Sequence, residues 1–183
     1  ALVADLISEG HHVDVLTRNP EKARNILPSG GRVYQWDGRS STGWSHLIEK
    51  TDAIINLAGE SIAGESLSAI ITRRWTPAQK DRILQSRLEV GRALVAAIKS
   101  SSKKPEVFIQ ASAVGYYGPY EDIAIPESTP AGSDFLAGVC QAWEDSTAEV
   151  EKMGVRRVVI RTGLILAPKG GILPMMLLPF RLF

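Results

Sequence analysis

The feature that most constrains the fold is an apolar segment that turns polar at its end, Val107 to Gly118. It begins as Val-Phe-Ile without alternation, which is typical of a strand buried on both faces of a parallel sheet. It then passes through small residues into a tyrosine pair flanked by glycines. Ligands of open parallel sheets bind where strands end at their carboxyl edge. The segment therefore predicts a central strand that delivers polar groups to a ligand-binding edge.

Strands and helices alternate on both sides of this segment. Apolar stretches predict further strands at Val13–Thr17, Val33–Trp36, Ala53–Leu57 and Val158–Leu166. Helical spacing and capping signals predict helices at Leu2–Ile7, after Asn19, from Thr76 to Ile98, and from about Phe135 to Met153. Because such alternation is typical of βαβ units, we expect one α/β domain over residues 1–183, built on a parallel sheet.

Composition excludes several classes of function. A net charge of +1 over 183 residues gives no sign of nucleic acid or an anionic membrane as partner. No apolar run reaches the roughly 20 residues that a membrane-spanning helix needs. Three histidines and one cysteine without clustered spacing predict no metal site. The single cysteine, Cys140, excludes an internal disulfide and fits a reducing compartment, so we expect a cytoplasmic protein.

Several short motifs together indicate a family. Asn56-Leu57-Ala58-Gly59, Ser112 with Tyr117-Gly118, and Arg161-Thr162-Gly163 follow in order on successive predicted strands. With these motifs the chain resembles the extended short-chain dehydrogenases/reductases. It is most similar to their atypical, epimerase-like family, which carries the description NAD-dependent epimerase/dehydratase or nucleoside-diphosphate-sugar epimerase. The closer match includes Glu60-Ser61-Ile62, Arg74-Trp75, Ser86-Arg87, Ala111–Gly118, Trp143-Glu144 and Leu177–Leu182.

The resemblance implies a Rossmann-type doubly wound parallel sheet with a dinucleotide across its carboxyl edge. The first strand and the glycine-rich loop that seats the pyrophosphate would then precede Ala1, and the substrate-binding part would follow Phe183. The chain opens on a helix without a start signal and closes on an apolar stretch. We therefore expect a fragment of a longer protein.

The first group of predicted cofactor contacts follows the strand Val13–Thr17. NAD-binding relatives carry an acid at the position of Arg18, whereas an Arg pairs with a 2′-phosphate, so NADP is expected rather than NAD. The alternative for Arg18 is a solvated side chain at a helix start. Thr17 and Asn19 would add hydrogen bonds. Asp37 resembles the superfamily's adenine-contacting acid, or else it forms a turn.

The second group lies at the ends of the strand Ala53–Leu57 and of the central strand that begins at Val107, and on the helix between these two strands. Its members are Asn56, Leu57, Ala58, Gly59, Arg87, Ala111 and Ser112. Gly59 lacks the side chain that would block a flat ligand, although a plain tight turn would also explain it. Arg87 shares one helix face with Lys80, and this face either reaches the cofactor or is a charged solvent face.

The proton relay of typical superfamily members is missing. That relay uses a Tyr as proton donor, a Lys four residues later that lowers the pKa of the phenol, and a Ser or Thr. Tyr-x-x-x-Lys occurs nowhere in the sequence, and the aligned positions are Leu136 and Cys140, both apolar here. Cys140 is interpreted as a core thiol rather than a nucleophile. The remaining candidates for catalysis, each with a structural alternative, are Ser112, Tyr117 and Glu60.

We therefore expect an NADP-binding protein of the atypical epimerase-like group, with oxidoreductase or isomerase activity on an unidentified small molecule. The alternative is a non-catalytic NADP-binding regulatory or sensor protein. A serine hydrolase is excluded, because Gln110 replaces the first glycine of a nucleophile elbow and all three histidines precede Ser112.

Overall fold

The computed structural model describes residues 1–62, 75–166, 173–177 and 180. In this part the elements follow in the order α1 (Leu2–Ser8), β1 (Asp14–Thr17), α2 (Pro20–Ile26), β2 (Arg32–Gln35), η1 (Ser45–Lys50), β3 (Ala53–Asn56), α4 (Pro77–Ser100), β4 (Val107–Ala113), η2 (Val114–Tyr117), α5 (Phe135–Asp145), η3 (Ala148–Met153), β5 (Arg156–Thr162) and α6 (Leu173–Met176). The η elements are 3₁₀ helices. Arg74 and most of the Leu177–Leu182 motif fall outside the described residues.

The strands pair in parallel and form two sheets, β1-β2 and β3-β4-β5. Thr17 and Gln35, the last residues of β1 and β2, lie opposite each other, and so do Ala113 and Thr162 at the ends of β4 and β5. Asn56, the last residue of β3, lies opposite Gln110, after which β4 continues to Ala113. Parallel pairing brings the carboxyl ends of neighbouring strands to one edge. The α/β fold with parallel strands and alternating helices is confirmed. The described strands form two sheets rather than one, with β1 in the first sheet and β3 in the second.

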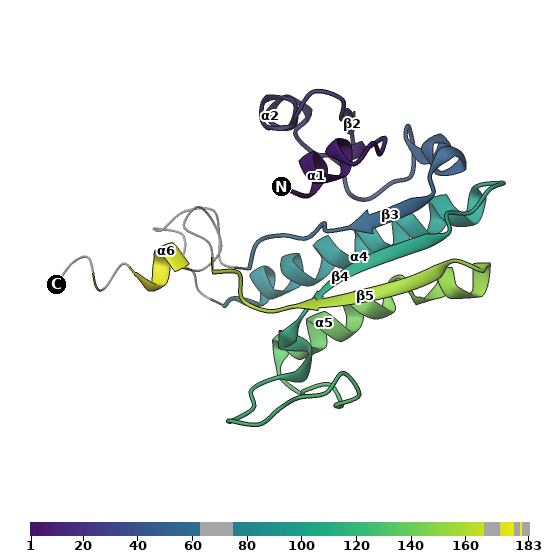
Figure 1. The fold of residues 1–183 in the computed structure, drawn as a ribbon. Coiled ribbons are helices and arrows are strands. Elements are labelled where there is room, and N and C mark those ends of the chain that lie inside the picture. The colour runs from purple at the N-terminus through teal and green to yellow at the C-terminus, as the bar shows by residue number, and fades with distance from the viewer. Residues whose placement is uncertain (63–74, 167–172, 178–179, 181–183) are drawn as a thin grey trace.

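Helices α4 and α5 cover one face of the three-stranded sheet (Figure 1). Helix α4 begins where its capping signal predicts, since the Thr76 hydroxyl accepts a hydrogen bond from the Gln79 amide at 3.3 Å. The buried face of α4 includes Ile83, Leu94 and Ile98. This helix packs into one core cluster with the β1-β2 side of the molecule, to which Trp36, Trp44 and Leu16 belong. One hydrophobic core therefore connects both sheets.

The helix predicted from Phe135 to Met153 is divided in two. Helix α5 ends at Asp145, and the 3₁₀ helix η3 follows. The carbonyl oxygen of Glu144 accepts hydrogen bonds from the Thr147 hydroxyl at 3.3 Å and from the Arg157 guanidinium at 2.9 Å. Because side chains satisfy this carbonyl, the α-helical ladder ends here.

The last strand starts earlier and ends earlier than predicted. It covers Arg156–Thr162 instead of Val158–Leu166, and its pairing begins with the Arg156 amide donating to the Glu106 carbonyl at 3.0 Å. A search for apolar stretches misses the start of β5, because Arg156 and Arg157 occupy its first two positions. No helix in the described part of the chain is long and apolar enough to cross a membrane.

Candidate functional site

A cleft of about 800 Å³ opens at the carboxyl ends of β1 and β3. Its size lies within the range of about 300–1,000 Å³ that is usual for small-molecule sites. β1 contributes Thr17, which Arg18 follows, and the loop after β3 contributes Leu57–Glu60. The other wall comes from α4, with Asp81, Arg82, Gln85, Ser86, Glu89 and Val90. The structure therefore brings predicted contacts from distant parts of the sequence into one cleft.

Acids and cations in this cleft are partly paired with one another. Arg39 contacts Glu89 at 2.9 Å, and Arg82 lies 3.9 Å from the carboxylate of Glu60. Arg18 is exposed, lines both this cleft and an adjoining hollow of about 490 Å³, and forms no ion pair within the described ranges. The guanidinium of Arg18 is therefore available to a negatively charged group of a ligand.

Asp37 and Asn19 are used in local structure. The Asp37 carboxylate accepts hydrogen bonds from the Ser40 amide at 2.9 Å and the Arg39 amide at 2.8 Å, and these bonds lower the pKa of Asp37. Asp37 thus forms the turn that was the alternative to a cofactor contact, although it also lines the cleft. The Asn19 side chain caps α2 by accepting from the Lys22 amide at 3.0 Å. A contact of either residue with a cofactor stays a prediction.

Asn56 and Gln110 form a buried polar link beneath the cleft. The Asn56 amide group donates to Gln110 Oε1 at 3.0 Å, and Asn56 Oδ1 accepts from the Ala58 amide at 3.2 Å. Both side chains are buried, and the Gln110 side chain also donates to the Ala111 carbonyl at 2.7 Å. Buried polar groups need such partners. Asn56 therefore fixes the exit of β3, while Asn56 and Ala111 are not among the cleft's lining residues.

Gly59 makes room for Arg87. A Cβ atom built at Gly59 would lie 3.1 Å from Cζ of Arg87, so a larger residue would push the guanidinium away. Arg87 Nη2 donates to the Glu60 carbonyl at 3.2 Å, and the Ser86 hydroxyl accepts from the Glu60 amide at 3.0 Å. Burial lowers the pKa of Arg87. Arg87 thus fixes the backbone of the loop Leu57–Glu60, which lines the cleft.

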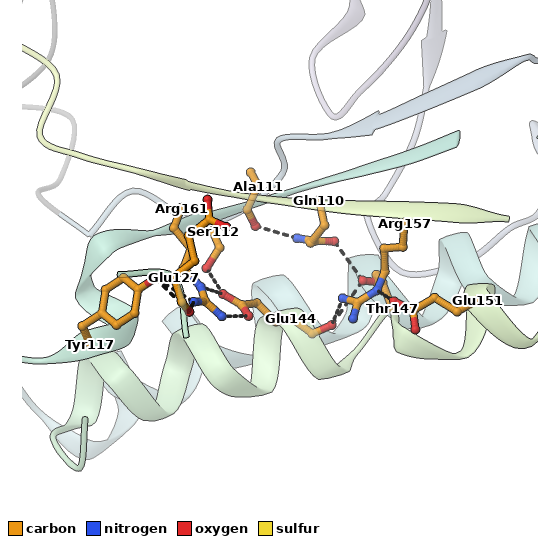
Figure 2. Close-up of polar contacts among 10 residues, drawn as sticks. All are labelled: Gln110, Ala111, Ser112, Tyr117, Glu127, Glu144, Thr147, Glu151, Arg157 and Arg161. Atoms are coloured by element: carbon orange, nitrogen blue, oxygen red, sulfur yellow. Dashed lines mark hydrogen bonds and ion pairs between the residues drawn. The ribbon is translucent and has the colours of Figure 1, made fainter. Parts of the chain in front are cut away.

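The other predicted catalytic residues lie in a separate network, which we call the Arg161 cluster (Ser112, Tyr117, Glu144 and Arg161) (Figure 2). Arg161 forms two hydrogen bonds of 2.9 Å to the Glu144 carboxylate, and its Nη1 donates to the Tyr117 hydroxyl at 2.8 Å. The Ser112 hydroxyl donates to Glu144 Oε1 at 2.6 Å. The Glu144 carboxylate raises the pKa of Arg161, so the guanidinium stays charged.

The three predicted catalytic residues therefore lie in two places. Glu60 lines the cleft, whereas Ser112 and Tyr117 are only 3% and 8% exposed and belong to the Arg161 cluster. Ser112 shares its strand face with Phe108 and Gln110, all three buried. A catalytic role for any of the three stays a prediction.

Cys140 is buried on α5, and this burial raises the pKa of its thiol. A thiol that keeps its proton is a poor nucleophile, which agrees with the core interpretation. No group of three His, Cys, Asp or Glu side chains that is suited to a metal ion occurs among the described residues.

Sequence reasoning missed Glu144 and Arg161 as structural partners. A signal for Glu144 was present, because it follows Cys140 by four residues and so lies on the buried stripe of α5. A carboxylate on such a stripe requires a counter-charge or donors. Arg157, Val159 and Arg161 are two residues apart along β5, so their side chains lie on the same half-buried face of the strand. Two cations on a half-buried face indicate that acceptors lie opposite them.

Comparison with known proteins agrees with this geometry. The NAD dependent epimerase/dehydratase family matches residues 1–138. The chloroplastic SDR39U1 homolog of Arabidopsis thaliana, an epimerase family protein, is 35% identical over 187 residues, which cover 100% of this chain and 50% of the relative. The Bacillus subtilis epimerase family protein YfhF is 36% identical, with 98% of this chain and 55% of the relative covered. The chain thus spans about half the length of these relatives.

A solved structure has the same fold. The crystal structure of human epimerase family protein SDR39U1 with NADPH superposes with a TM-score of 0.71 at 29% identity, covering 99% of this chain and 55% of that one. Together with the family match over residues 1–138, this places the chain in the NAD-dependent epimerase/dehydratase family.

Proposed function

We propose that this chain forms the nucleotide-binding part of an NADP(H)-dependent oxidoreductase or isomerase that acts on a small molecule. The observation that carries the proposal is the exposed Arg18, which follows β1 on the rim of a cleft of about 800 Å³ and forms no ion pair with any residue that the structure describes. The planar guanidinium of an arginine is suited to bidentate hydrogen bonds with a phosphate such as the 2′-phosphate of NADP. The NADPH in the related human structure supports the same cofactor.

The residues of the cleft fit a dinucleotide. Arg18 would hold the 2′-phosphate, and the loop Leu57–Glu60 would support the ligand with its backbone, since it lies at the carboxyl edge of the sheet. NADPH, when bound, supplies a hydride. The chain itself binds and orients the ligand, and the Asn56–Gln110 link keeps the β3 exit in place.

The first test is a fluorescence titration of the full-length protein with NADPH and, separately, with NADH. We expect tighter binding of NADPH. Replacing Arg18→Ala removes a charged hydrogen bond of about 1.5–3 kcal/mol, which corresponds to a roughly 10- to 100-fold loss of NADPH affinity with little effect on NADH. Arg24→Ala, at an exposed position of α2, is the matched control and should change neither affinity. Equal losses for both nucleotides would show that Arg18 does not recognise the 2′-phosphate.

A second candidate is a non-catalytic NADP-binding sensor or regulatory protein. It is favoured by the internal hydrogen bonds of Ser112 and Tyr117, whose hydroxyl groups contact Glu144 and Arg161 respectively. The positions aligned with the missing Tyr and Lys are Leu136 and the buried Cys140. A Tyr117 variant separates the two candidates, as described in the Discussion.

A further inference from the structure

Trp75 is an exposed aromatic side chain at the edge of the sheet where ligands bind. It is 50% exposed, whereas Trp36, Trp44 and Trp143 are at most 8% exposed. The ring of Trp75 contacts the ring of Phe135 edge to face, with the ring centres 5.7 Å apart. Trp75 lies just before α4, and Phe135 is the first residue of α5. Because α4 follows β3 and α5 follows β4, both helices begin at the carboxyl edge of the sheet (Figure 1).

Lys80, near the start of α4, contacts the same phenylalanine. Its ammonium nitrogen lies 4.9 Å from the centre of the Phe135 ring, and the side chain is half-buried. Within the described ranges no carboxylate pairs with this ammonium, although Lys99 and Lys103 each pair with an acid. An ammonium group has three donors, and a contact with an aromatic face does not satisfy all of them. Lys80 can therefore receive an acidic group of a ligand.

The acids near Lys80 have other partners. Asp134 caps the start of α5, and Asp81 accepts a hydrogen bond at 3.3 Å from a side chain one turn further along α4. The Glu60 carboxylate lies 3.9 Å from Arg82. In the part of the chain that the structure describes, none of these acids forms an ion pair with Lys80, so its charge is not neutralised by them.

Trp75, Lys80 and Phe135, which we call the aromatic shelf, adjoin the proposed cofactor cleft. Asp81 and Arg82 follow Lys80 directly on α4, and both line the cleft. A reaction with a bound cofactor requires a substrate site beside the cofactor, so that the reacting atoms are held together. The shelf combines aromatic surface with a single cation. This combination is suited to a flat ring that carries an acidic group.

We propose that the aromatic shelf is the substrate-recognition site, and that the substrate is a planar, aromatic carboxylic acid. Its ring packs against Trp75, and its carboxylate accepts a hydrogen bond from the ammonium of Lys80. This inference rests on the proposed function and specifies the class of small molecule on which the protein acts. It assigns substrate recognition to residues that are separate from the lining of the cofactor cleft.

The test is an NMR titration of the full-length protein, saturated with NADP⁺, with 2-naphthoate as the probe. 2-Naphthamide has the same ring without the charge, and acetate has the carboxylate without the ring. Binding is followed by the indole N–H signal of Trp75, which is assigned by its loss in Trp75→Phe. We expect 2-naphthoate to shift this signal with a dissociation constant of about 1 mM or below. 2-Naphthamide and acetate should bind roughly three- to tenfold more weakly.

Variants at Lys80 test the role of its charge. Lys80→Met keeps an extended side chain and removes the ammonium, so affinity for 2-naphthoate should fall roughly three- to tenfold while affinity for 2-naphthamide stays the same. Lys80→Arg keeps the charge and should keep the preference for 2-naphthoate. Lys50→Met, at the exposed end of η1, is the matched control and should bind both probes as the wild type does. NADPH affinity should be equal in all of these proteins.

Three outcomes would overturn the proposal. They are a Trp75 signal that 2-naphthoate does not shift, equal affinity of the wild type for 2-naphthoate and 2-naphthamide, and equal losses for both probes in Lys80→Met. If Lys80→Met fails to fold, the comparison of the two probes on the wild type decides. A wild type that does not bind NADPH would refute the proposed function itself. Normal NADPH binding without a response to 2-naphthoate would refute only the class of substrate.

Discussion

At the scale of single residues, Arg161 is the side chain that connects most parts of the Arg161 cluster. It joins β5 to Glu144 on α5, to the Tyr117 hydroxyl, and to the Glu127 carbonyl at 3.2 Å. The guanidinium carbon of Arg161 also lies 3.4 Å from the centre of the Tyr116 ring. The side chains of Arg161 and Glu144 are 22% and 10% exposed, so their ion pair is largely removed from water. Tyr117 therefore has a structural role whatever else it does.

Replacing Tyr117→Phe tests whether that structural role is the only one. Loss of the acceptor for Arg161 should lower the free energy of unfolding by about 1 kcal/mol, measured by urea denaturation, and leave NADPH affinity unchanged. Under the leading function, the variant also loses NADPH consumption with a panel of small carbonyl compounds. Consumption equal to that of wild type would remove Tyr117 from the mechanism. Tyr120→Phe, on an exposed tyrosine, is the control.

At the scale of elements, α4 and the end of α5 approach closely at Gly91. A Cβ built there would lie 2.8 Å from Cβ of Ser146 and still closer to its hydroxyl oxygen. Gly91→Ala should therefore force the helices apart and lower the free energy of unfolding by about 1–3 kcal/mol. Gly138→Ala is the matched control, because it is exposed on α5 and its Cβ meets nothing within 4 Å. This second change should stabilise the protein by up to about 1 kcal/mol, and equal stability of the two variants would contradict the close approach.

The accuracy of sequence prediction also differs between elements. The start of α4 was predictable because Thr76 and Pro77 carry a local capping signal. The end of α5 was not, because Thr147 and Arg157 determine it and their contacts form only in the folded chain. The same distinction holds for the site. The position of Arg18 follows from the end of a strand, whereas the pairing of Arg161 with Glu144 joins residues 17 apart on different elements.

At the scale of the whole molecule, the described residues leave part of one face of the three-stranded sheet exposed. Helices α4 and α5 cover one face (Figure 1), while Val158 and Ile160 of β5 are 36% and 45% exposed on the other. Sheets of parallel strands are normally buried on both faces. The described strands form two sheets, with β1 in one and β3 in the other. If the chain follows the expected Rossmann order 3-2-1-4-5-6, β1 and β3 correspond to its second and fourth strands. In that order, the first strand lies between them.

We therefore propose that, in the full-length protein, a further parallel strand pairs with both β1 and β3 and makes the two sheets one. Hydrogen exchange followed by NMR tests this arrangement. In a parallel strand, alternate amides point to opposite neighbours, so the β3 amides directed away from β4 are bonded only if such a strand is present. We expect all amides of β3 (Ala53–Asn56) to exchange as slowly as those of β4, which serves as the internal reference. Fast exchange at alternate β3 positions would show that the edge between β1 and β3 is open in the whole protein as well.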